Sequence, residues 1–69
     1  MLKPGTKFYY RPINWLNGKP KMNHKDWGRV GQIIKVKEIT NQVEPLYYFR
    51  FLGEFTMCYA DISEIEVIE

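Results

Sequence analysis

The chain has 69 residues and a mass of 8.3 kDa, which leaves room for one small hydrophobic core. Its 45% hydrophobic and 16% aromatic content is typical of a globular protein rather than a disordered one. A lone Cys58 and a lone His24 exclude an internal disulfide framework and a Cys/His metal cluster. We therefore expect a single domain over residues 1–69, without a metal or a cofactor.

The N-terminal segment MLKPGTKFYY lacks the apolar stretch of a secretory signal peptide. The sequence also contains no apolar run of the roughly 18 residues needed to cross a bilayer. These features favour a cytoplasmic protein that does not contact a membrane.

Charge is divided unevenly along the chain, although the net charge is only +2. Residues 1–37 hold nine lysines and arginines against Asp26 alone, a net charge of +8. Residues 38–69 hold Arg50 against seven acidic residues, a net charge of −6. This asymmetry favours an acidic partner, either a nucleic acid or an acidic protein surface. The alternative is that the two halves interleave in space and neutralise each other on a mixed surface.

Alternating runs of aromatic and β-branched residues predict an all-β fold. In the third run, the alternation places Tyr47, Phe49 and Phe51 on one face and Tyr48 and Arg50 on the other, and we expect Phe51 to face the core. No segment keeps an amphipathic helical pattern for about ten residues, so we expect no long helix. The five expected strands cover residues 5–11, 28–40, 46–52, 55–60 and 65–68.

The connections between these runs indicate how the strands are joined. Gly53-Glu54 predicts a two-residue hairpin with a type II′ turn, and residues 41–45 predict a polar turn. Residues 61–64 leave room for a single helical turn, which Asp61 would cap and from which Ile62 would close the barrel end. Five strands with one helical turn before the last predict a five-stranded SH3-like barrel.

The connection after the first strand, residues 12–27, is longer than a compact barrel needs. Loops of more than about 12 to 15 residues are uncommon in compact domains and are usually functional. Asn17-Gly18 between two short runs is a strong hairpin signal, and Pro20 confines the second arm to an edge position. We expect a protruding, hairpin-like basic loop.

Basic and aromatic residues interleave along this loop and at its ends. Lysines and arginines can contact phosphates or carboxylates, and an exposed tryptophan can anchor a partner. Trp27 precedes the second strand, where it is more often a structural cover for the barrel end, and Trp15 is equally compatible with either role. The candidate partner-binding residues are Arg11, Trp15, Lys19, Lys21, Lys25, Trp27 and Arg29, with His24 among them.

A nucleophile with its base is the only catalytic arrangement that the residue types suggest. Cys58 would need His24 as its base and Asp61 to orient the imidazole. However, Cys58 lies in an expected strand without a basic neighbour to lower its pKa, and His24 lies on the loop. We expect a buried, inert thiol and a solvent-facing imidazole, and therefore no enzyme.

Most of the chain resembles the general pattern of SH3-like barrels. The matching segments are PGTKFYYRP (4–12), Trp15, GRVGQIIKV (28–36), YYFRF (47–51) and ADISEIEVI (60–68). These barrels include KOW-type and Tudor-like binders of nucleic acids and histones. They also include photosystem I reaction-centre subunit IV, to which the stretch RPINW (11–15) is locally similar. That resemblance implies docking of acidic ferredoxin, with only Arg11 and Lys7 matching by position.

Together these observations predict a non-catalytic binding module that uses the basic, Trp-containing loop. We expect an acidic protein partner, as for a docking, accessory or inhibitory protein. The first alternative is a nucleic-acid-binding, KOW-type barrel, whose affinity would fall steeply with salt. The second is a ferredoxin-docking subunit of a photosynthetic complex. Exposed strand edges are compatible with a monomer or a weak dimer.

Overall fold

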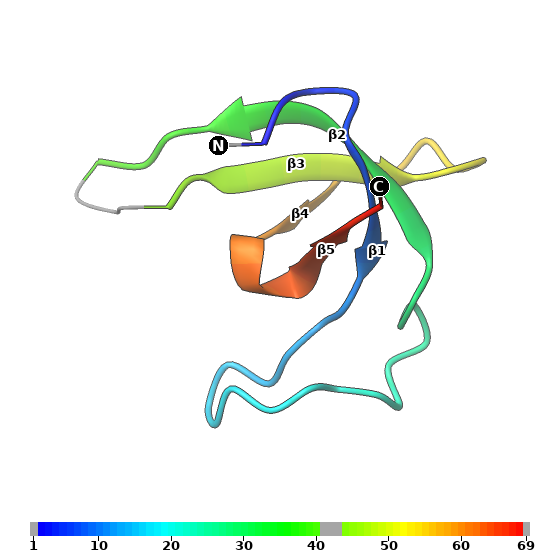
Figure 1. Ribbon diagram of the computed structural model, residues 1–69, viewed down its shortest axis with the longest axis vertical. Coiled ribbons are helices and arrows are strands. Elements are labelled where there is room, and N and C mark those ends of the chain that lie inside the picture. The colour runs from blue at the N-terminus through cyan, green and yellow to red at the C-terminus, as the bar shows by residue number, and fades with distance from the viewer. Residues whose placement is uncertain (1, 41–43, 69) are drawn as a thin grey trace.

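The computed structural model describes residues 2–40 and 44–68, which form one antiparallel sheet and one short 3₁₀ helix (Figure 1). The elements are β1 (Lys7–Tyr10), β2 (Val30–Lys37), β3 (Leu46–Phe51), β4 (Cys58–Ala60), the 3₁₀ turn η1 (Ile62–Glu64) and β5 (Ile65–Val67). No helix in the described part of the chain is long and apolar enough to span a bilayer. The predicted polar turn at residues 41–45 falls largely outside the described residues.

The sheet has the strand order β4-β3-β2-β1-β5, with every neighbouring pair antiparallel. The long strand β2 pairs with β1 at one end and with β3 along its length, and it curves strongly (Figure 1). A register shift between Ile33 and Lys35 allows this bend, since a bulge locally increases twist. The curvature brings the two ends of the sheet towards a common core.

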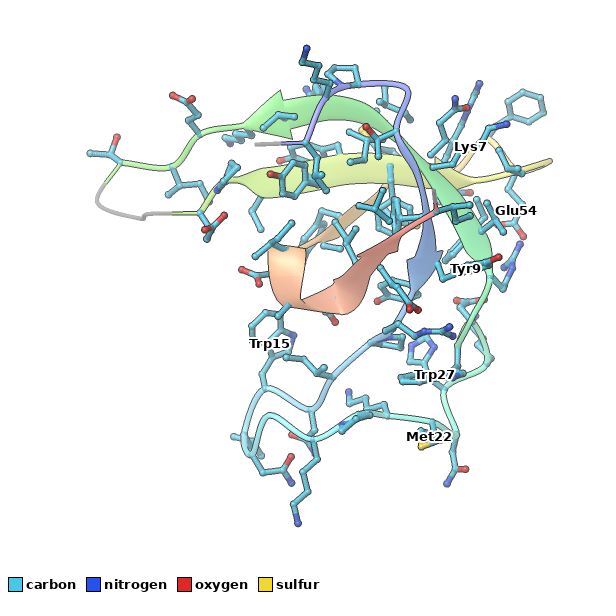
Figure 2. All side chains as sticks on the ribbon, viewed as in Figure 1. Lys7, Tyr9, Trp15, Met22, Trp27 and Glu54 are labelled. Carbon is cyan, nitrogen blue, oxygen red and sulfur yellow. The ribbon has the colours of Figure 1, made fainter. Side chains whose placement is uncertain are left out.

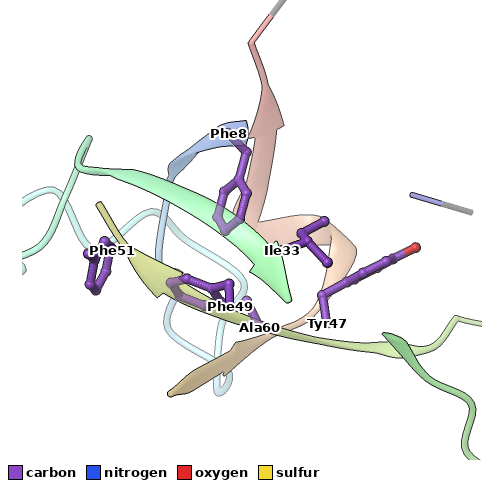
Figure 3. Close-up of a cluster of buried hydrophobic side chains, with 6 residues drawn as sticks. All are labelled: Phe8, Ile33, Tyr47, Phe49, Phe51 and Ala60. Atoms are coloured by element: carbon purple, nitrogen blue, oxygen red, sulfur yellow. The ribbon is translucent and has the colours of Figure 1, made fainter. Parts of the chain in front are cut away.

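The core is built mainly from aromatic rings on the concave face of the sheet (Figure 3). Phe49 packs edge-to-face against Phe8 at 5.0 Å and against Phe51 at 5.2 Å between ring centroids. A Cβ on Gly31 would lie 2.9 Å from both Phe8 and Phe49, so only glycine allows β2 to approach these rings. The buried hydrophobic residues are Phe8, Ile33, Tyr47, Phe49, Phe51 and Ala60.

Several predicted features of the fold are confirmed. Tyr47, Phe49 and Phe51 are all buried, as the alternation in β3 predicts. The single helical turn forms at the expected place, and the Asp61 carboxylate accepts a hydrogen bond from Ser63 N at 2.9 Å. Ile62 packs against the core from this turn. The all-β prediction with five strands is therefore confirmed.

The sheet is not closed into a barrel, which corrects the prediction of barrel closure. β4 and β5 lie at opposite ends of the strand order, and within the described residues they do not pair with each other. Each has only three residues, and η1 separates them along the chain. Strands of three residues have few backbone N–H and C=O groups with which to hydrogen-bond. We attribute the missing β4–β5 pairing to this shortness.

The connection between β3 and β4 also differs from the prediction. Gly53, with φ of 86°, is the third residue of a turn in which Glu54 N donates to Phe51 O at 3.0 Å. A positive φ at the third position is the requirement of a type II turn, not of a type II′ turn. Residues 54–57 then run outside the sheet, which leaves the Phe55 side chain 91% exposed. The fourth strand is therefore shorter than predicted.

Candidate functional site

The long loop between β1 and β2 contains the predicted hairpin and extends away from the sheet (Figure 1). Asn14 N donates to Lys19 O at 2.8 Å, and Gly18 N donates to Asn14 O at 2.6 Å. Gly18 has φ of 71°, a conformation that glycine adopts without strain. Ile13 and Pro20 form an isolated antiparallel bridge at the base of the hairpin. The predicted hairpin-like loop is present, but it closes between Asn14 and Lys19, so Asn17-Gly18 forms the end of a longer turn.

Side-chain amides add order to the turn of this hairpin. Asn14 Oδ1 accepts from Leu16 N at 2.9 Å, and Asn17 Oδ1 accepts from Lys19 N at 2.9 Å. Such local bonds replace the backbone partners that an irregular turn lacks. The hairpin therefore has a defined shape before any partner binds.

The loop is also tied to η1 through Glu64, a buried carboxylate with 5% exposure. Arg11 N donates to the Glu64 carbonyl oxygen at 2.8 Å, and Ile13 N donates to Glu64 Oε2 at 3.2 Å. Removal of a buried carboxylate that accepts hydrogen bonds leaves the donors without partners, which lowers the free energy of unfolding. Glu64 thus fixes the direction in which the loop leaves β1.

Arg11, a predicted binding residue, is engaged within the protein. Its Nε and Nη2 both lie 2.9 Å from Glu66 Oε2. Its guanidinium lies 5.3 Å from the ring centroids of both Tyr9 and Trp27. This combination of ion pair and cation–π contacts holds Arg11 between β1, β5 and the end of the loop.

Arg29 is held in a similar way. Its Nη1 lies 2.8 Å from Asp26 Oδ1 and its Nη2 lies 2.8 Å from Glu54 Oε1, while its guanidinium lies 4.2 Å from the Phe51 ring centroid. The hydrogen bond from Arg29 holds the pKa of Asp26 below its ordinary value, despite some opposing desolvation. The same bonds raise the pKa of Arg29 above its ordinary value. Arg29 is therefore a structural residue in the free protein.

Two ion pairs of the arginines join the basic half of the sequence to the acidic half. Arg11 pairs with Glu66 and Arg29 pairs with Glu54. The alternative that the halves interleave and neutralise each other is confirmed at these positions. Charge asymmetry along the sequence thus overstates the free positive charge of the surface.

Trp27 and His24 also serve the fold. Trp27 is half-buried, and the Arg11 guanidinium lies over its ring. His24 is half-buried, lies edge-to-face to Tyr10 at 5.9 Å, and accepts from Asp26 N through Nδ1 at 3.0 Å. The expectation of a solvent-facing imidazole is corrected, because this loop folds back towards the end of β1.

The part of the loop farther from the sheet, residues 16–25, is here called the outer loop. Lys19, Lys21 and Lys25 are exposed there, and within the described residues none of the three has an ion-pair partner. Leu16 is 96% exposed and Met22 is 70% exposed. Sequence reasoning missed these two apolar residues, although Leu16 beside Asn17-Gly18 already lies in a turn that buries little.

A shallow depression of about 390 Å³ marks the outer loop. It is formed by consecutive residues, so it belongs to the loop alone, and Lys21 and Met22 lie in its wall together. Pro20, Lys21, Met22, Asn23 and His24 line it. A charged and an apolar side chain therefore border the same concave surface.

Trp15 borders a different cavity from the one that Lys21 and Met22 line. It is 65% exposed and lies beside η1, as Figure 2 shows. It borders a second cavity, of about 320 Å³, which lies between the loop and the ends of β3 and β4. The lining residues are Tyr10, Trp15, Leu46, Tyr59, Ala60, Asp61 and Glu64. The predicted patch therefore has three parts. They are a base, where Arg11 and Arg29 are ion-paired, the exposed outer loop, and the cavity beside Trp15.

Cys58 is half-buried, and its Sγ lies 3.9 Å from Thr56 O. Burial raises the pKa of the Cys58 thiol, and the negative charges of Asp26 and Glu54 raise it further against the opposing effect of Arg29. A thiol with a raised pKa is a poor nucleophile at neutral pH. Within the described residues, no group of three or more His, Cys, Asp or Glu side chains gathers as a metal site.

Comparison with known proteins finds no matching family model, no matching curated protein and no matching solved structure. The resemblance to SH3-like barrels and to the photosystem I subunit remains a prediction. The features of the molecule that indicate a function are the outer loop and the second cavity.

Proposed function

We propose that this protein is a non-catalytic binding module whose outer loop docks onto an acidic protein surface. The observation that carries the proposal is the exposure of Lys19, Lys21 and Lys25 on an ordered loop, while Arg11 and Arg29 are paired internally. An ordered loop loses less conformational entropy on binding than a flexible one. The three lysines are therefore ready to meet carboxylates at low ordering cost.

The apolar residues of the outer loop favour a protein partner over a nucleic acid. Leu16 and Met22 expose large apolar side chains among the lysines. Methionine and apolar contacts are typical of the centre of protein interfaces, whereas nucleic-acid affinity comes mainly from many phosphate contacts. Of the five basic candidate residues, Arg11 and Arg29 form ion pairs, and within the described part of the chain Lys19, Lys21 and Lys25 do not.

The ferredoxin-docking alternative receives less support from the contacts. Only Lys7 and Arg11 match that family by position, and Arg11 binds Glu66 at 2.9 Å. An arginine already paired within the protein contributes little new attraction to a partner. An acidic protein of another kind, docked on the outer loop, is the form of the proposal that we favour.

The test compares binding of polyglutamate and of a duplex DNA, each labelled, to the natural protein at low and at physiological salt. A K19E/K21E/K25E variant removes the outer-loop charge, and a K3E/K7E/K37E variant makes the same charge change at exposed positions elsewhere. We expect the K19E/K21E/K25E variant to lose polyglutamate binding. The K3E/K7E/K37E variant should bind polyglutamate at least severalfold more tightly than the K19E/K21E/K25E variant does. An additional L16S/M22S variant measures how much the apolar side chains of Leu16 and Met22 contribute to the binding of an acidic protein.

Two outcomes would overturn the proposal. Equal loss of binding in both charge variants would show that net charge, rather than the outer loop, attracts the acid. Tighter binding of the duplex than of polyglutamate at physiological salt, dependent on the loop lysines, would favour the nucleic-acid alternative.

A further inference from the structure

The strand β4 ends the sheet and carries exposed apolar side chains. It is the last strand in the order β4-β3-β2-β1-β5, so within the described residues one of its edges pairs with β3 and the other pairs with no strand. The side chain of Phe55 is 91% exposed, that of Tyr59 67% and that of Met57 50%. These three residues are here called the edge patch. Apolar groups exposed together in this way mark interaction surfaces on soluble proteins.

The Tyr59 ring lies on the convex face of the sheet, opposite the core. Tyr59 pairs with Tyr48 across β4 and β3, and the two ring centroids lie 6.4 Å apart. The residues next to them in each strand, Phe49 and Ala60, are buried on the concave face. Lys35 pairs with Tyr48 from β2, and its Nζ lies 5.0 Å from the Tyr48 ring centroid. This row of side chains therefore crosses the convex face and ends on the exposed Tyr59 ring at the free edge.

The backbone of Tyr59 points away from β3. Leu52 N donates to Val30 O at 3.2 Å, so the even-numbered residues of β3 hydrogen-bond to β2. The residues between them, including Phe49, therefore hydrogen-bond to β4, where Phe49 pairs with Cys58. Alternation then directs the N–H and C=O of Tyr59, the next residue along β4, to the free edge. In the part of the chain that the structure describes, no backbone group outside the sheet bonds to them.

A free strand edge is complementary to a second copy of itself that runs in the opposite direction. With a two-fold axis beside Tyr59, its N–H donates to the Tyr59 C=O of the second copy, and symmetry forms the reverse bond. The two Tyr59 residues then lie about 5.5 Å apart between Cα atoms, with both rings on the convex face. The aromatic row continues from Tyr48 of one copy to Tyr48 of the other, and such cross-strand aromatic pairs stabilise a sheet.

Arg50 places a positive charge beside the edge patch. Because Phe49 pairs with Cys58, the register sets Arg50 level with Met57. The Arg50 guanidinium lies 5.9 Å from the Phe55 ring centroid, and within residues 2–40 and 44–68 it forms no ion pair. The edge of β4 that begins at Met57 is therefore positively charged on its convex side.

Asp61 places the opposite charge at the other end of β4. It caps η1 through Oδ1, with Ser63 N at 2.9 Å, and the cap leaves its negative charge in place. An axis beside Tyr59 sets residues two positions before and after it opposite each other, so Met57 of one copy faces Asp61 of the other. Arg50, one strand behind Met57, then lies about 10 Å from that Asp61 between Cα atoms, a distance that the two side chains span together. Symmetry repeats the pair, so the charges around the edge match a second copy.

We propose that two copies of this chain associate by antiparallel β4–β4 pairing, with Tyr59 opposite Tyr59 on a two-fold axis and Arg50 of each copy facing Asp61 of the other. The ladder ends at Asp61, whose backbone N and O bond to Glu64 within η1. A pair of three-residue strands makes a small interface, and interfaces below about 1,200 Å² are typical of transient complexes. We therefore expect a reversible dimer that forms at high protein concentration.

The dimer is independent of the outer loop, because residues 16–25 take no part in β4 or its pairing. We expect the K19E/K21E/K25E variant to dimerise like the natural protein. A variant that cannot dimerise should in turn bind polyglutamate like the natural protein. The two proposals can therefore fail separately.

Sedimentation equilibrium over a range of concentrations measures the association, and amide hydrogen exchange on the same samples locates it. We expect the average mass to rise from 8.3 kDa towards twice that value as the concentration increases. The Tyr59 amide should exchange rapidly in dilute samples and become protected as the dimer forms. The amides of Cys58 and Ala60, which face β3, should be protected at every concentration.

Matched variants test the β4 edge against the other free edge of the sheet. Tyr59→Lys sets two like charges opposite each other on the axis, and Val67→Lys makes the same change at an exposed position on β5. We expect dimerisation to weaken about tenfold or more in the first variant and to be unchanged in the second. Arg50→Glu should weaken it severalfold, and Lys37→Glu is the control at another exposed position.

A mixture of two variants tests the position of the axis. Tyr59→Lys and Tyr59→Glu should each fail to dimerise, because like charges meet on the axis. Mixed in equal amounts, they should associate, since opposite charges then face each other. Association in the mixture alone requires that position 59 of one copy lies opposite position 59 of the other.

Three results would overturn the proposal. A mass that stays at 8.3 kDa up to millimolar concentration would show that the chain does not self-associate. Association without protection of the Tyr59 amide, or association lost in Val67→Lys and kept in Tyr59→Lys, would place the contact elsewhere. Binding of a single-stranded oligonucleotide by a protein that stays monomeric, weakened in Arg50→Glu, would assign the edge patch to a nucleic acid instead.

Discussion

The base and the outer part of the same loop use their positive charges in opposite ways. At the base, Arg11 and Arg29 are bound to carboxylates at 2.8 to 2.9 Å and lie over aromatic rings. In the outer loop, Lys19, Lys21 and Lys25 are exposed. The difference follows residue type, because the planar guanidinium can pair and stack at once, whereas ammonium groups stay hydrated.

This contrast changes how the basic loop is interpreted. The arginines stabilise the junction between loop and sheet, and their replacement should affect folding more than binding. The lysines contribute little to the fold, and their replacement should affect binding more than folding.

The largest expected effect concerns the ring beneath Arg29. Phe51 is 4% exposed, so Phe51→Asp places an unpaired charge in the core and should cost at least about 3 to 5 kcal/mol of unfolding free energy. Leu52 is 48% exposed, and Leu52→Asp should cost less than about 1 kcal/mol. Urea unfolding measures both, and equal midpoints would contradict the side-chain alternation in β3.

A smaller effect is expected at Arg11. Arg11→Met keeps a long apolar side chain but loses the pair with Glu66 and the contacts with Tyr9 and Trp27, at a cost of about 1 kcal/mol. Lys7→Met, at an exposed position on β1, is the control and should be nearly neutral. Polyglutamate binding should be unchanged in both. A loss of binding in Arg11→Met alone would assign the base a direct role in recognition.

The ion pair of Asp26 with Arg29 predicts a dependence on pH. The pKa of Asp26 is lowered in the folded protein, so its contribution to stability is fully present above the ordinary value of 3.8. It is lost as the pH falls through the lowered pKa. Asp26→Asn should therefore be less stable than the natural protein at neutral pH, with the difference disappearing in strong acid. Thermal unfolding at a series of pH values measures this, and a constant difference would contradict it.

The smallest effect on stability is expected for the outer loop. Replacement of Lys19, Lys21 and Lys25 by alanine should change the unfolding free energy by less than about 0.5 kcal/mol each, since their side chains are exposed. Polyglutamate binding should nevertheless fall severalfold. A large loss of stability would show that these lysines belong to the fold in the same way as the arginines.

Local patterns predicted the parts of the molecule that depend on neighbouring residues. The alternation of Tyr47, Phe49 and Phe51, the capped turn after Asp61 and the Asn17-Gly18 turn all form as expected. In each case the determining interaction spans six residues or fewer, or follows the two-residue period of a strand. Such signals can be read directly from the order of residues.

Features that depend on distant contacts could not be predicted in this way. The short β4 and the open sheet depend on how the chain runs after the Gly53 turn, where Glu54 reaches Arg29 at 2.8 Å. The cavity combines Tyr10, Trp15 and Glu64 from segments that no spacing rule relates. Sequence reasoning saw Trp15 only as part of the basic loop, because it cannot show which way a loop residue turns.

The sequence by itself determined the strand content, the hairpin of the loop and the position of the helical turn, because these arise from local conformational preference and side-chain alternation. Only the tertiary structure decided which positive charges are paired. Ion pairs such as Arg11 with Glu66 join residues 55 positions apart, and that pairing depends on β1 lying beside β5. Within the described residues, the basic candidates that remain without an ion pair are Lys19, Lys21 and Lys25 of the outer loop.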